Sequence, residues 1–374
     1  MEQNYHEVES QASLRELMLR GGVVRRQAFQ NLDFTRESVS EDLAFEECIF
    51  LGCALPPSVK ERIAESCYIF PRMESEYNPF RSKLYSAQEL YAGFDRFSPE
   101  SYEDTLDSRV YKCYMRYGRQ TRDISRTLMR TLHDHSITNA LNDMIGEYEP
   151  RQVVAVMGGH AMRRDEGRYL DIARISKSLT ERGLLIISGG GPGAMEAAHL
   201  GAWMAGREDE ELCEAVRFLS SAPTYKDRQW LSLSFKVMER YPRRESFRSI
   251  GIPTWFYGHE PATPFASHIA KYFDNSIRED GLLALAKGGV IYSPGSAGTM
   301  QEIFQDAAQN HYLTFDIASP MVFLGKEYWA EQMPIYDLLQ RLHEQGRYQN
   351  LKLMLADEWE DVVRRIERFS ISGE

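Results

Sequence analysis

The spacing of apolar and polar positions changes along the chain. Near the N-terminus, two similar pieces at residues 28–34 and 44–53 alternate apolar and polar positions, which predicts short strands in a hairpin or a partial β-coil. Two such pieces do not support a full repeat architecture. From about residue 86 to residue 148, apolar residues recur every four or five positions, which predicts helices. Residues 1–148 are therefore expected to form a mixed α+β extension, and its role is unknown.

From residue 149 onward, unbroken apolar runs alternate with helical spacing. The runs predict buried parallel strands at Val153–Met157, 184–187, 252–257, 290–292 and 321–324. Helices are expected between them, including one from about 268 to 278 and a closing one at 359–369. An arginine-rich segment at 207–248 interrupts the rhythm as an insertion. Because strand–helix alternation forces right-handed crossovers, residues 149–374 are predicted to form an α/β domain with a doubly wound parallel sheet.

Composition and charge narrow the class of protein. The 374 residues suffice for two domains, and the net charge of −11 argues against general affinity for nucleic acid. No apolar run approaches the roughly 18–20 residues of a membrane span. The N-terminus is acidic and lacks the basic and apolar regions of a signal peptide, and the five cysteines are scattered. We therefore expect a cytoplasmic protein with reduced cysteines and with neither nucleic-acid nor membrane partners.

Two glycine-rich turns, each between a predicted strand and a predicted helix, carry the strongest chemical signal. The first contains Gly189, Gly190, Gly191 and Gly193, and the second runs Pro294-Gly295-Ser296-Ala297-Gly298-Thr299. Glycines let the backbone approach a ligand, and the free N–H groups of a helix N-terminus point at an anion. Together with Gly158 and Gly159 after the first strand of the sheet, these turns are expected to bind the phosphate of a nucleotide. For the first turn, a tight turn without a ligand is the alternative.

Two charged residues accompany the second turn. Glu302 falls on the first turn of the following helix, either as a catalytic carboxylate or as a residue that interacts with the helix dipole by about 0.3–1 kcal/mol. Arg278 is expected to reach the same crevice and to hold a phosphate or a developing charge. Its alternative is a surface ion pair with Glu279 or Asp280. The insertion supplies further arginines that form either a solvated face or a lid over the ligand, namely Arg243, Arg244 and Arg248.

Other candidates are weaker. His133 and His135 lie two positions apart and would diverge on a helix, so they are expected to cap a helix or to lie on the surface rather than to bind a metal. No metal site is predicted. His160 and Met195 are candidates for a base pocket, together with Trp255 and Tyr257, and packing in the core is the alternative for each.

Three segments in order, 153–159, 188–198 and 294–302, resemble the Lonely Guy family. Its members are Rossmann-like nucleoside 5′-monophosphate phosphoribohydrolases that were long mislabelled as lysine decarboxylases. The similarity spans about residues 150–330, and the larger bacterial pyrimidine/purine nucleotide nucleosidases share this core and also carry an N-terminal extension. The family motif P-G-G-x-G-T-x-x-E is met except that Ser296 replaces its second glycine. The family arginine is usually followed by lysine, where Glu279 stands here.

The resemblance implies a Rossmann-like fold, a homodimer, no cofactor, and a catalytic pair that falls on Arg278 and Glu302. The implied reaction is hydrolysis of the N-glycosidic bond of a nucleoside 5′-monophosphate, AMP by default, to free base and ribose 5-phosphate. A decarboxylase that uses pyridoxal phosphate would need a Schiff-base lysine, and the lysines of the core lie outside both glycine turns. The alternative from another class is a non-catalytic nucleotide sensor on the same fold.

Overall fold

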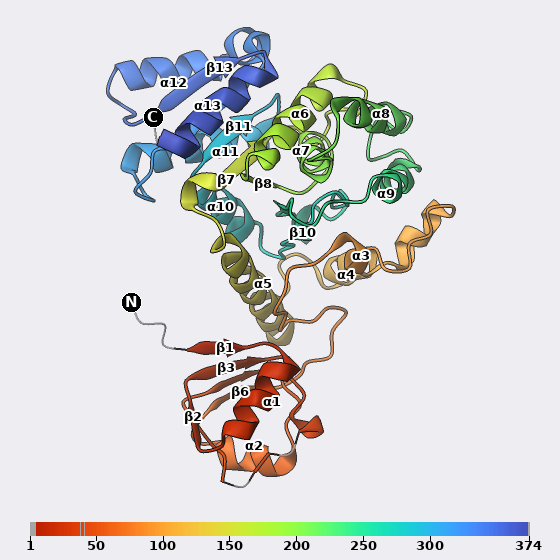
Figure 1. Cartoon of the computed structure of the whole chain (residues 1–374), viewed down its shortest axis with the longest axis vertical. Coiled ribbons are helices and arrows are strands. Elements are labelled where there is room, and N and C mark those ends of the chain that lie inside the picture. The colour runs from red at the N-terminus through yellow and green to blue at the C-terminus, as the bar shows by residue number, and fades with distance from the viewer. Residues whose placement is uncertain (1–4, 38, 41, 373–374) are drawn as a thin grey trace. The chain divides into compact units, whose positions relative to one another are not determined.

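The computed structural model describes residues 5–37, 39–40 and 42–372, and both of its parts can be followed in Figure 1. The described residues fall into two compact units. The first lies within Met1–Leu84 and Gln120–Leu141, and the second within Tyr85–Arg119 and Asn142–Glu374.

The first unit is built from short parallel strands, not from a hairpin. One sheet has the order β1-β3-β5-β6, and a second pairs β2 with β4. The strands are β1 (His6–Val8), β2 (Val23–Arg25), β3 (Gln27–Gln30), β4 (Ala44–Glu46), β5 (Ile49–Leu51) and β6 (Tyr68–Phe70), with α1 (Gln11–Arg20), η1 (Phe34–Arg36) and α2 (Pro57–Ile63) between them. The hairpin alternative is therefore wrong and the β-coil alternative is confirmed.

Successive coils of this unit place equivalent residues beside each other. Phe29 pairs with Phe50 across β3 and β5, and Val24 pairs with Phe45 across β2 and β4, so the chain returns to the same place after 21 residues. The Phe29 and Phe50 rings stack at 4.9 Å between centroids, and Phe34 and Phe45 pack edge-on against Phe29. These buried aromatic rings form the core of the first unit.

Helix α5 (Ile124–Ile145) begins in the first unit, and it corrects one expectation. His133 is fully buried, and its Nδ1 lies 3.0 Å from Oδ1 of Asp134, so it is a core residue rather than a cap or surface residue. His135 points elsewhere and is exposed, as the spacing of two on a helix predicts.

The second unit is organised around a parallel sheet of seven strands in the order β10-β9-β8-β7-β11-β12-β13. The strands are β7 (Val153–Met157), β8 (Leu185–Ser188), β9 (Ser249–Gly251), β10 (His268–Ile269), β11 (Gly289–Tyr292), β12 (Pro320–Leu324) and β13 (Lys352–Ala356). The chain builds one half outward from β7, returns to the centre, and builds the other half outward from β11. This is the order of a doubly wound, Rossmann-like fold, with its switch point between β7 and β11.

Helices connect these strands and pack on the sheet (Figure 1). They are α6 (Gly167–Glu181), α7 (Ala194–Trp203), α8 (Asp209–Leu219), α9 (Trp230–Arg240), α10 (Asn275–Leu285), α11 (Ala297–Tyr312), α12 (Ile335–Glu344) and α13 (Trp359–Ser372), with short turns η3 (Pro150–Gln152), η4 (Trp255–Tyr257) and η5 (Glu327–Gln332). Gly201 of α7 lies against the backbone of Ala173, where a Cβ would stand 2.0 Å from its carbonyl oxygen, so α6 and α7 approach closely. The expected insertion at 207–248 contains α8 and α9.

The structure corrects three predicted elements. The strand expected at 252–257 is β9 at Ser249–Gly251, and Trp255–Tyr257 form a 3-10 turn whose cap is Thr254. The helix expected from 268 begins only at Asn275, because His268–Ile269 pair with β9 as a strand. A further strand, β13, follows the last predicted one.

The boundary between the units differs from the expected division at residues 148 and 149. Residues 85–119 belong with the sheet and carry α3 (Ala87–Leu90), η2 (Pro99–Asp104) and α4 (Leu106–Tyr117). Tyr85 exchanges two backbone hydrogen bonds with Ile269, at 3.0 and 2.8 Å. Buried Asp107 of α4 accepts hydrogen bonds from Trp255 Nε1 at 3.0 Å and Lys271 Nζ at 2.5 Å. Long-range pairing of this kind leaves no periodic signal in the sequence.

Candidate functional site

The carboxyl ends of β7, β8, β9 and β11 open into one pocket of about 240 Å³. This is the edge of a doubly wound sheet where ligands bind, beside the switch point. The pocket is lined by Gly158, Gly159, His160, Gly189, Gly191, Met195, Pro253, Thr254, Tyr257, Glu260, Arg278, Glu279, Ser296, Gly298, Thr299 and Glu302. The structure thus brings together residues from both glycine turns and both charged candidates.

The first turn, residues 188–193, is buried throughout. Gly193 has a φ of +71°, and a Cβ there would stand 2.4 Å from the Gly159 carbonyl oxygen. Only glycine accommodates both the left-handed backbone and this close approach. Ser188 Oγ accepts the Gly190 N–H at 3.1 Å and lies 2.9 Å from Nε2 of buried His199. Burial lowers the pKa of His199 to about 3, so this imidazole is neutral near pH 7. Its contact with Ser188 helps to fix the position of the turn.

A buried ion pair anchors the helix that follows the first turn. The Arg164 guanidinium donates from Nε to Glu196 Oε2 at 3.0 Å, and both side chains are excluded from solvent. The same guanidinium donates to Ser234 Oγ at 2.6 Å and to the Trp230 carbonyl at 3.2 Å. Glu196 lies in the first turn of α7, so this network joins α7 to α9 and holds the turn in place.

The second turn, residues 294–299, is much more open. Ser296, Ala297 and Gly298 are exposed, and α11 starts without a side-chain hydrogen bond from its N-cap Ser296. A Cβ on Gly295 would stand 2.1 Å from Thr299 Oγ1, so glycine is needed where the turn folds onto its helix. Tyr328 donates a hydrogen bond from its hydroxyl to the Gly295 carbonyl oxygen at 2.5 Å. This contact occupies an acceptor of the turn and none of its N–H groups. The first N–H groups of α11 are therefore available to an anion.

Glu302 is half-buried at the pocket wall and lies in the second turn of α11, not in its first turn as expected, because the helix already begins at Ala297. Burial raises the pKa of its carboxyl to about 7; the Glu279 carboxylate adds to this rise and the Arg278 guanidinium opposes it. A carboxyl group that titrates near neutral pH can exchange protons with a bound water at modest cost.

Arg278 is 8% exposed and its side chain lines the pocket. Its Nη2 donates to Asn275 Oδ1 at 2.9 Å and to Glu279 Oε1 at 3.2 Å. A Cβ on Gly189 would lie 3.4 Å from Nη1 of Arg278, so the guanidinium extends to the first turn. Arg278 therefore lies in the pocket, and its pairing with Glu279 is largely buried rather than the surface ion pair that was the alternative.

Glu260 is the charged residue of the pocket that sequence reasoning missed. Its side chain is 17% exposed, and its Oε1 lies 3.7 Å from His160 Nδ1 and 3.7 Å from His259 Nε2. These distances exceed those of ordinary hydrogen bonds, so the carboxylate keeps its acceptor capacity for a ligand. It comes from an irregular loop with no periodic spacing. A ribose hydroxyl is one group that such a carboxylate recognises.

Other predicted residues lie outside the pocket lining. Gly190, Gly193, Gly295 and Ala297 shape the two turns but do not line the cavity. Trp255 is fully buried and stacks on Phe273 with centroids 4.6 Å apart, so it is a core residue. Met195, His160 and Tyr257 do line the pocket.

The arginines of the insertion lie elsewhere. Arg248 pairs with Glu147 at 2.6 Å, Arg244 lies beside Gly206, and Arg243 bonds to carbonyls of its own loop. None of these three lines the pocket, so the lid alternative is wrong for this structure.

Comparison with known proteins finds matches among solved structures alone. No family model matches the chain, and no curated protein matches it. Among solved structures, the molybdenum cofactor binding protein from Rippkaea orientalis is 15% identical over 58% of this chain and 96% of its own, with a TM-score of 0.36. The molybdenum cofactor carrier protein from Chlamydomonas reinhardtii is 14% identical over 59% and 98%, with a TM-score of 0.36. The protein TM1055 is 19% identical over 58% and 98%, also with a TM-score of 0.36.

One further property concerns membranes. Among the described residues, the helices are all too short or too polar to cross a bilayer.

Proposed function

We propose that this protein hydrolyses the N-glycosidic bond of a nucleoside 5′-monophosphate, releasing the base and ribose 5-phosphate. The observation that carries the proposal is the presence of Glu302, Arg278 and the open N-terminus of α11 in one pocket at the carboxyl edge of the sheet. The residues that resemble the Lonely Guy motifs are the ones that meet there. AMP is the default substrate on the basis of that resemblance.

In the proposed reaction the phosphate is bound by the N–H groups of the second turn. This remote binding energy holds the anomeric carbon against Glu302. The C1′–N bond breaks, its electron pair leaves with the base, and positive charge develops on the ribose ring. The ionised Glu302 stabilises that charge and accepts a proton from the water whose oxygen bonds to C1′, while the departing base takes up a proton. Glu260 is placed to accept a ribose hydroxyl, and Arg278 to bind the phosphate or the sugar.

A second candidate is a nucleotide-binding protein without catalysis. The observation that favours it is the ion pair between Arg278 and Glu279, because part of the guanidinium is already occupied where the family pattern has a second cation. The two proposals differ in one outcome, namely whether a bound nucleotide is cleaved.

The deciding experiment measures release of ribose 5-phosphate from AMP, GMP, IMP, CMP and UMP by the full-length protein. Under the enzyme proposal, at least one nucleotide is cleaved, and Glu302→Gln lowers kcat by about a thousandfold while nucleotide binding persists. Glu331→Gln, a change at an exposed glutamate outside the pocket, serves as the control. Nucleotide binding without cleavage by the wild type would favour the sensor. Sedimentation of the same samples tests the homodimer that the resemblance implies.

A further inference from the structure

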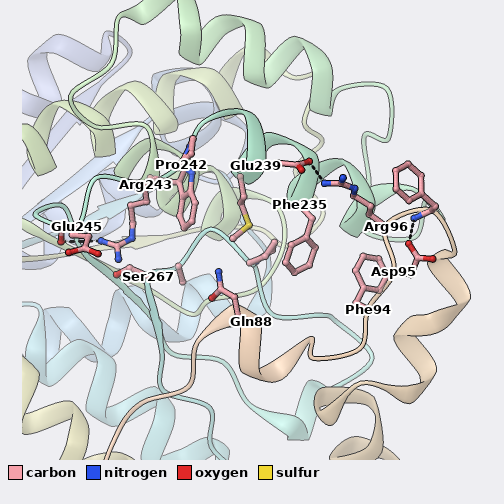
Figure 2. A pocket seen from close by; sticks show the side chains of 15 residues that line it. Gln88, Phe94, Asp95, Arg96, Phe235, Glu239, Pro242, Arg243, Glu245 and Ser267 are labelled. Atoms are coloured by element: carbon pink, nitrogen blue, oxygen red, sulfur yellow. Dashed lines mark hydrogen bonds and ion pairs between the residues drawn. The ribbon is translucent and has the colours of Figure 1, made fainter.

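A second and larger pocket of about 680 Å³ lies in the same unit, away from the candidate site (Figure 2). Its walls come from α9, from residues 94–97, and from the loops that precede β9 and β10, at 242–245 and 264–267. In a parallel sheet, these loops lie at the amino ends of the strands, whereas the candidate site lies at the carboxyl ends. The two pockets share no lining residue.

One side of this pocket is aromatic. Phe94 and Phe235 lie next to each other (Figure 2), and their ring centroids are 5.5 Å apart. Met238 continues the apolar surface. Phe97 lines the same pocket although 75% of its surface is exposed. A cavity of this volume that combines an aromatic side with polar and charged side chains on its other walls can hold a small molecule and fix its orientation. A flat ring would bury this exposed apolar surface.

A single arginine lies at the other end of the pocket. Nη1 of Arg243 donates to the carbonyls of Arg244, Glu245 and Phe247, at 3.2, 3.2 and 2.7 Å. These bonds fix the guanidinium by one nitrogen and leave the N–H groups of Nε and Nη2 for another acceptor. Within the described part of the chain, no carboxylate forms an ion pair with Arg243. Partial burial lowers the pKa of this guanidinium from its usual value, and the Glu245 carboxylate opposes this shift without forming an ion pair with Arg243.

The remaining charges restrict how many negative charges an occupant can carry. Glu239 is paired with Arg96, and Asp95 accepts the Phe97 N–H at 2.9 Å. Glu245 also lines the pocket, beside Arg243. These carboxylates would repel a polyphosphate, whereas a single anionic group could reach Arg243. Gln88 of α3 adds a neutral amide between the aromatic side and the arginine (Figure 2).

We propose that this pocket is a binding site for a planar aromatic molecule that carries one negative charge. The ring packs against Phe94 and Phe235, and the anionic group accepts hydrogen bonds from the free N–H groups of Arg243. The site is independent of the proposed hydrolysis, because it lies at the opposite edge of the sheet and uses other residues.

The test uses indole-3-acetate as the probe and the full-length protein in isothermal titration. We expect saturable binding with one molecule per chain. Indole-3-acetamide keeps the ring but lacks the charge, and acetate keeps the charge but lacks the ring. Each should bind at least about tenfold more weakly, because a charge-assisted hydrogen bond and the burial of an aromatic ring each contribute more than 1.4 kcal/mol. Equal affinity for the acid and its amide would overturn the proposal.

Two variants test whether the probe binds in this pocket. Arg243→Gln removes the cation, and Phe235→Leu removes the ring but leaves the loop bonds of Arg243 intact, so the second variant guards against a folding defect in the first. Both should weaken indole-3-acetate binding by about tenfold. Arg217→Gln, at an exposed arginine of α8, should bind like the wild type. The proposal fails if the wild type shows no saturable binding, or if both pocket variants bind the probe as tightly as the wild type does. The proposal also fails if the probe does not bind and Phe97→Asp dissociates a dimer. In that case a second copy of the chain covers the pocket.

Discussion

The two glycine turns of the candidate site follow the same strand-to-helix pattern but have opposite surroundings. The turn at 188–193 is buried, and side chains from distant segments hold it through His199 and through the Arg164–Glu196 ion pair. The turn at 294–299 exposes Ser296 to Gly298, and α11 begins there without a side-chain cap. Glycine thus performs two functions in one pocket: the first turn is a rigid wall, and the second presents its N–H groups.

The difference shows why glycine content alone does not identify a phosphate site. In the first turn, the glycines are required by close packing, since Cβ atoms at Gly190 and Gly193 would stand within 3 Å of neighbouring atoms. In the second turn, nothing lies within 4 Å of a Cβ on Gly298, so its side of the turn is free for a ligand. Glycine is therefore required by close packing in the first turn, and it leaves room for a ligand in the second turn.

The largest expected effect concerns the buried turn at 188–193. Arg164→Met leaves the buried Glu196 carboxylate without its partner and should lower the free energy of unfolding by about 3–5 kcal/mol, measured by urea denaturation. The double variant Arg164→Met/Glu196→Leu removes both charges and should recover most of the loss. If the single variant is as stable as the wild type, the first turn does not depend on this ion pair.

A second prediction concerns pH and the residues beside the open turn. Because burial raises the pKa of Glu302 to about 7, and because the ionised form is the one that accepts a proton, kcat should rise as pH increases through about 7. The Glu279 carboxylate is one cause of the raised pKa, so Glu279→Gln should move this rise to lower pH by about 0.5–1 unit.

The control for the pH profile is a second buried carboxyl group on the same helix. Burial also raises the pKa of Asp306 to about 7, but Asp306 bonds to the Tyr292 hydroxyl at 2.8 Å and does not line the pocket. Asp306→Asn should leave the midpoint of the kcat profile unchanged. A profile that follows Asp306 rather than Glu279 would show that Glu302 is not the titrating group.

The smallest expected effect tests the departure from the family motif. Ser296 is exposed, has a φ of −111° and makes no side-chain cap, so neither strain nor bonding distinguishes it from glycine. Ser296→Gly should change kcat/KM by less than about threefold and stability by less than about 1 kcal/mol. A larger change in kcat/KM would mean that the serine hydroxyl contacts the substrate.

The sequence predicts those parts of the fold that are both regular and buried. β7, β8, β11 and β12 are unbroken apolar runs, and the structure confirms them as strands. β13 was missed because Lys352–Ala356 include no β-branched or aromatic side chain, so their composition does not favour a strand. Residues 252–257 are apolar because Trp255 packs against Phe273 and donates to Asp107, not because they form a strand. Their burial depends on a segment almost 150 residues earlier, and no local pattern records such a contact.

Some residues of the candidate site could be predicted from the sequence and others could not. The glycine turns, Glu302 and Arg278 could be found because they stand at fixed offsets from predicted strands. Glu260 could not, because it lies on the loop that joins η4 to β10 and reaches the pocket only through tertiary packing. The pairing of Arg278 with Glu279 was open from the sequence, since adjacent residues on a helix do not ordinarily face each other.

The stacked coils of the first unit have a consequence for how this chain can vary in length. The left-handed corners at Arg26 and Asn31 recur at Glu47 and Gly52, so the coils up to β5 repeat their turns as well as their strands after 21 residues, whereas β6 follows β5 after 19. A segment of that length can be duplicated or removed, and the phenylalanine column only grows or shortens by one layer. Natural variants of this unit should therefore differ in length by whole coils, because adding or removing one coil leaves the packing within the other coils unchanged.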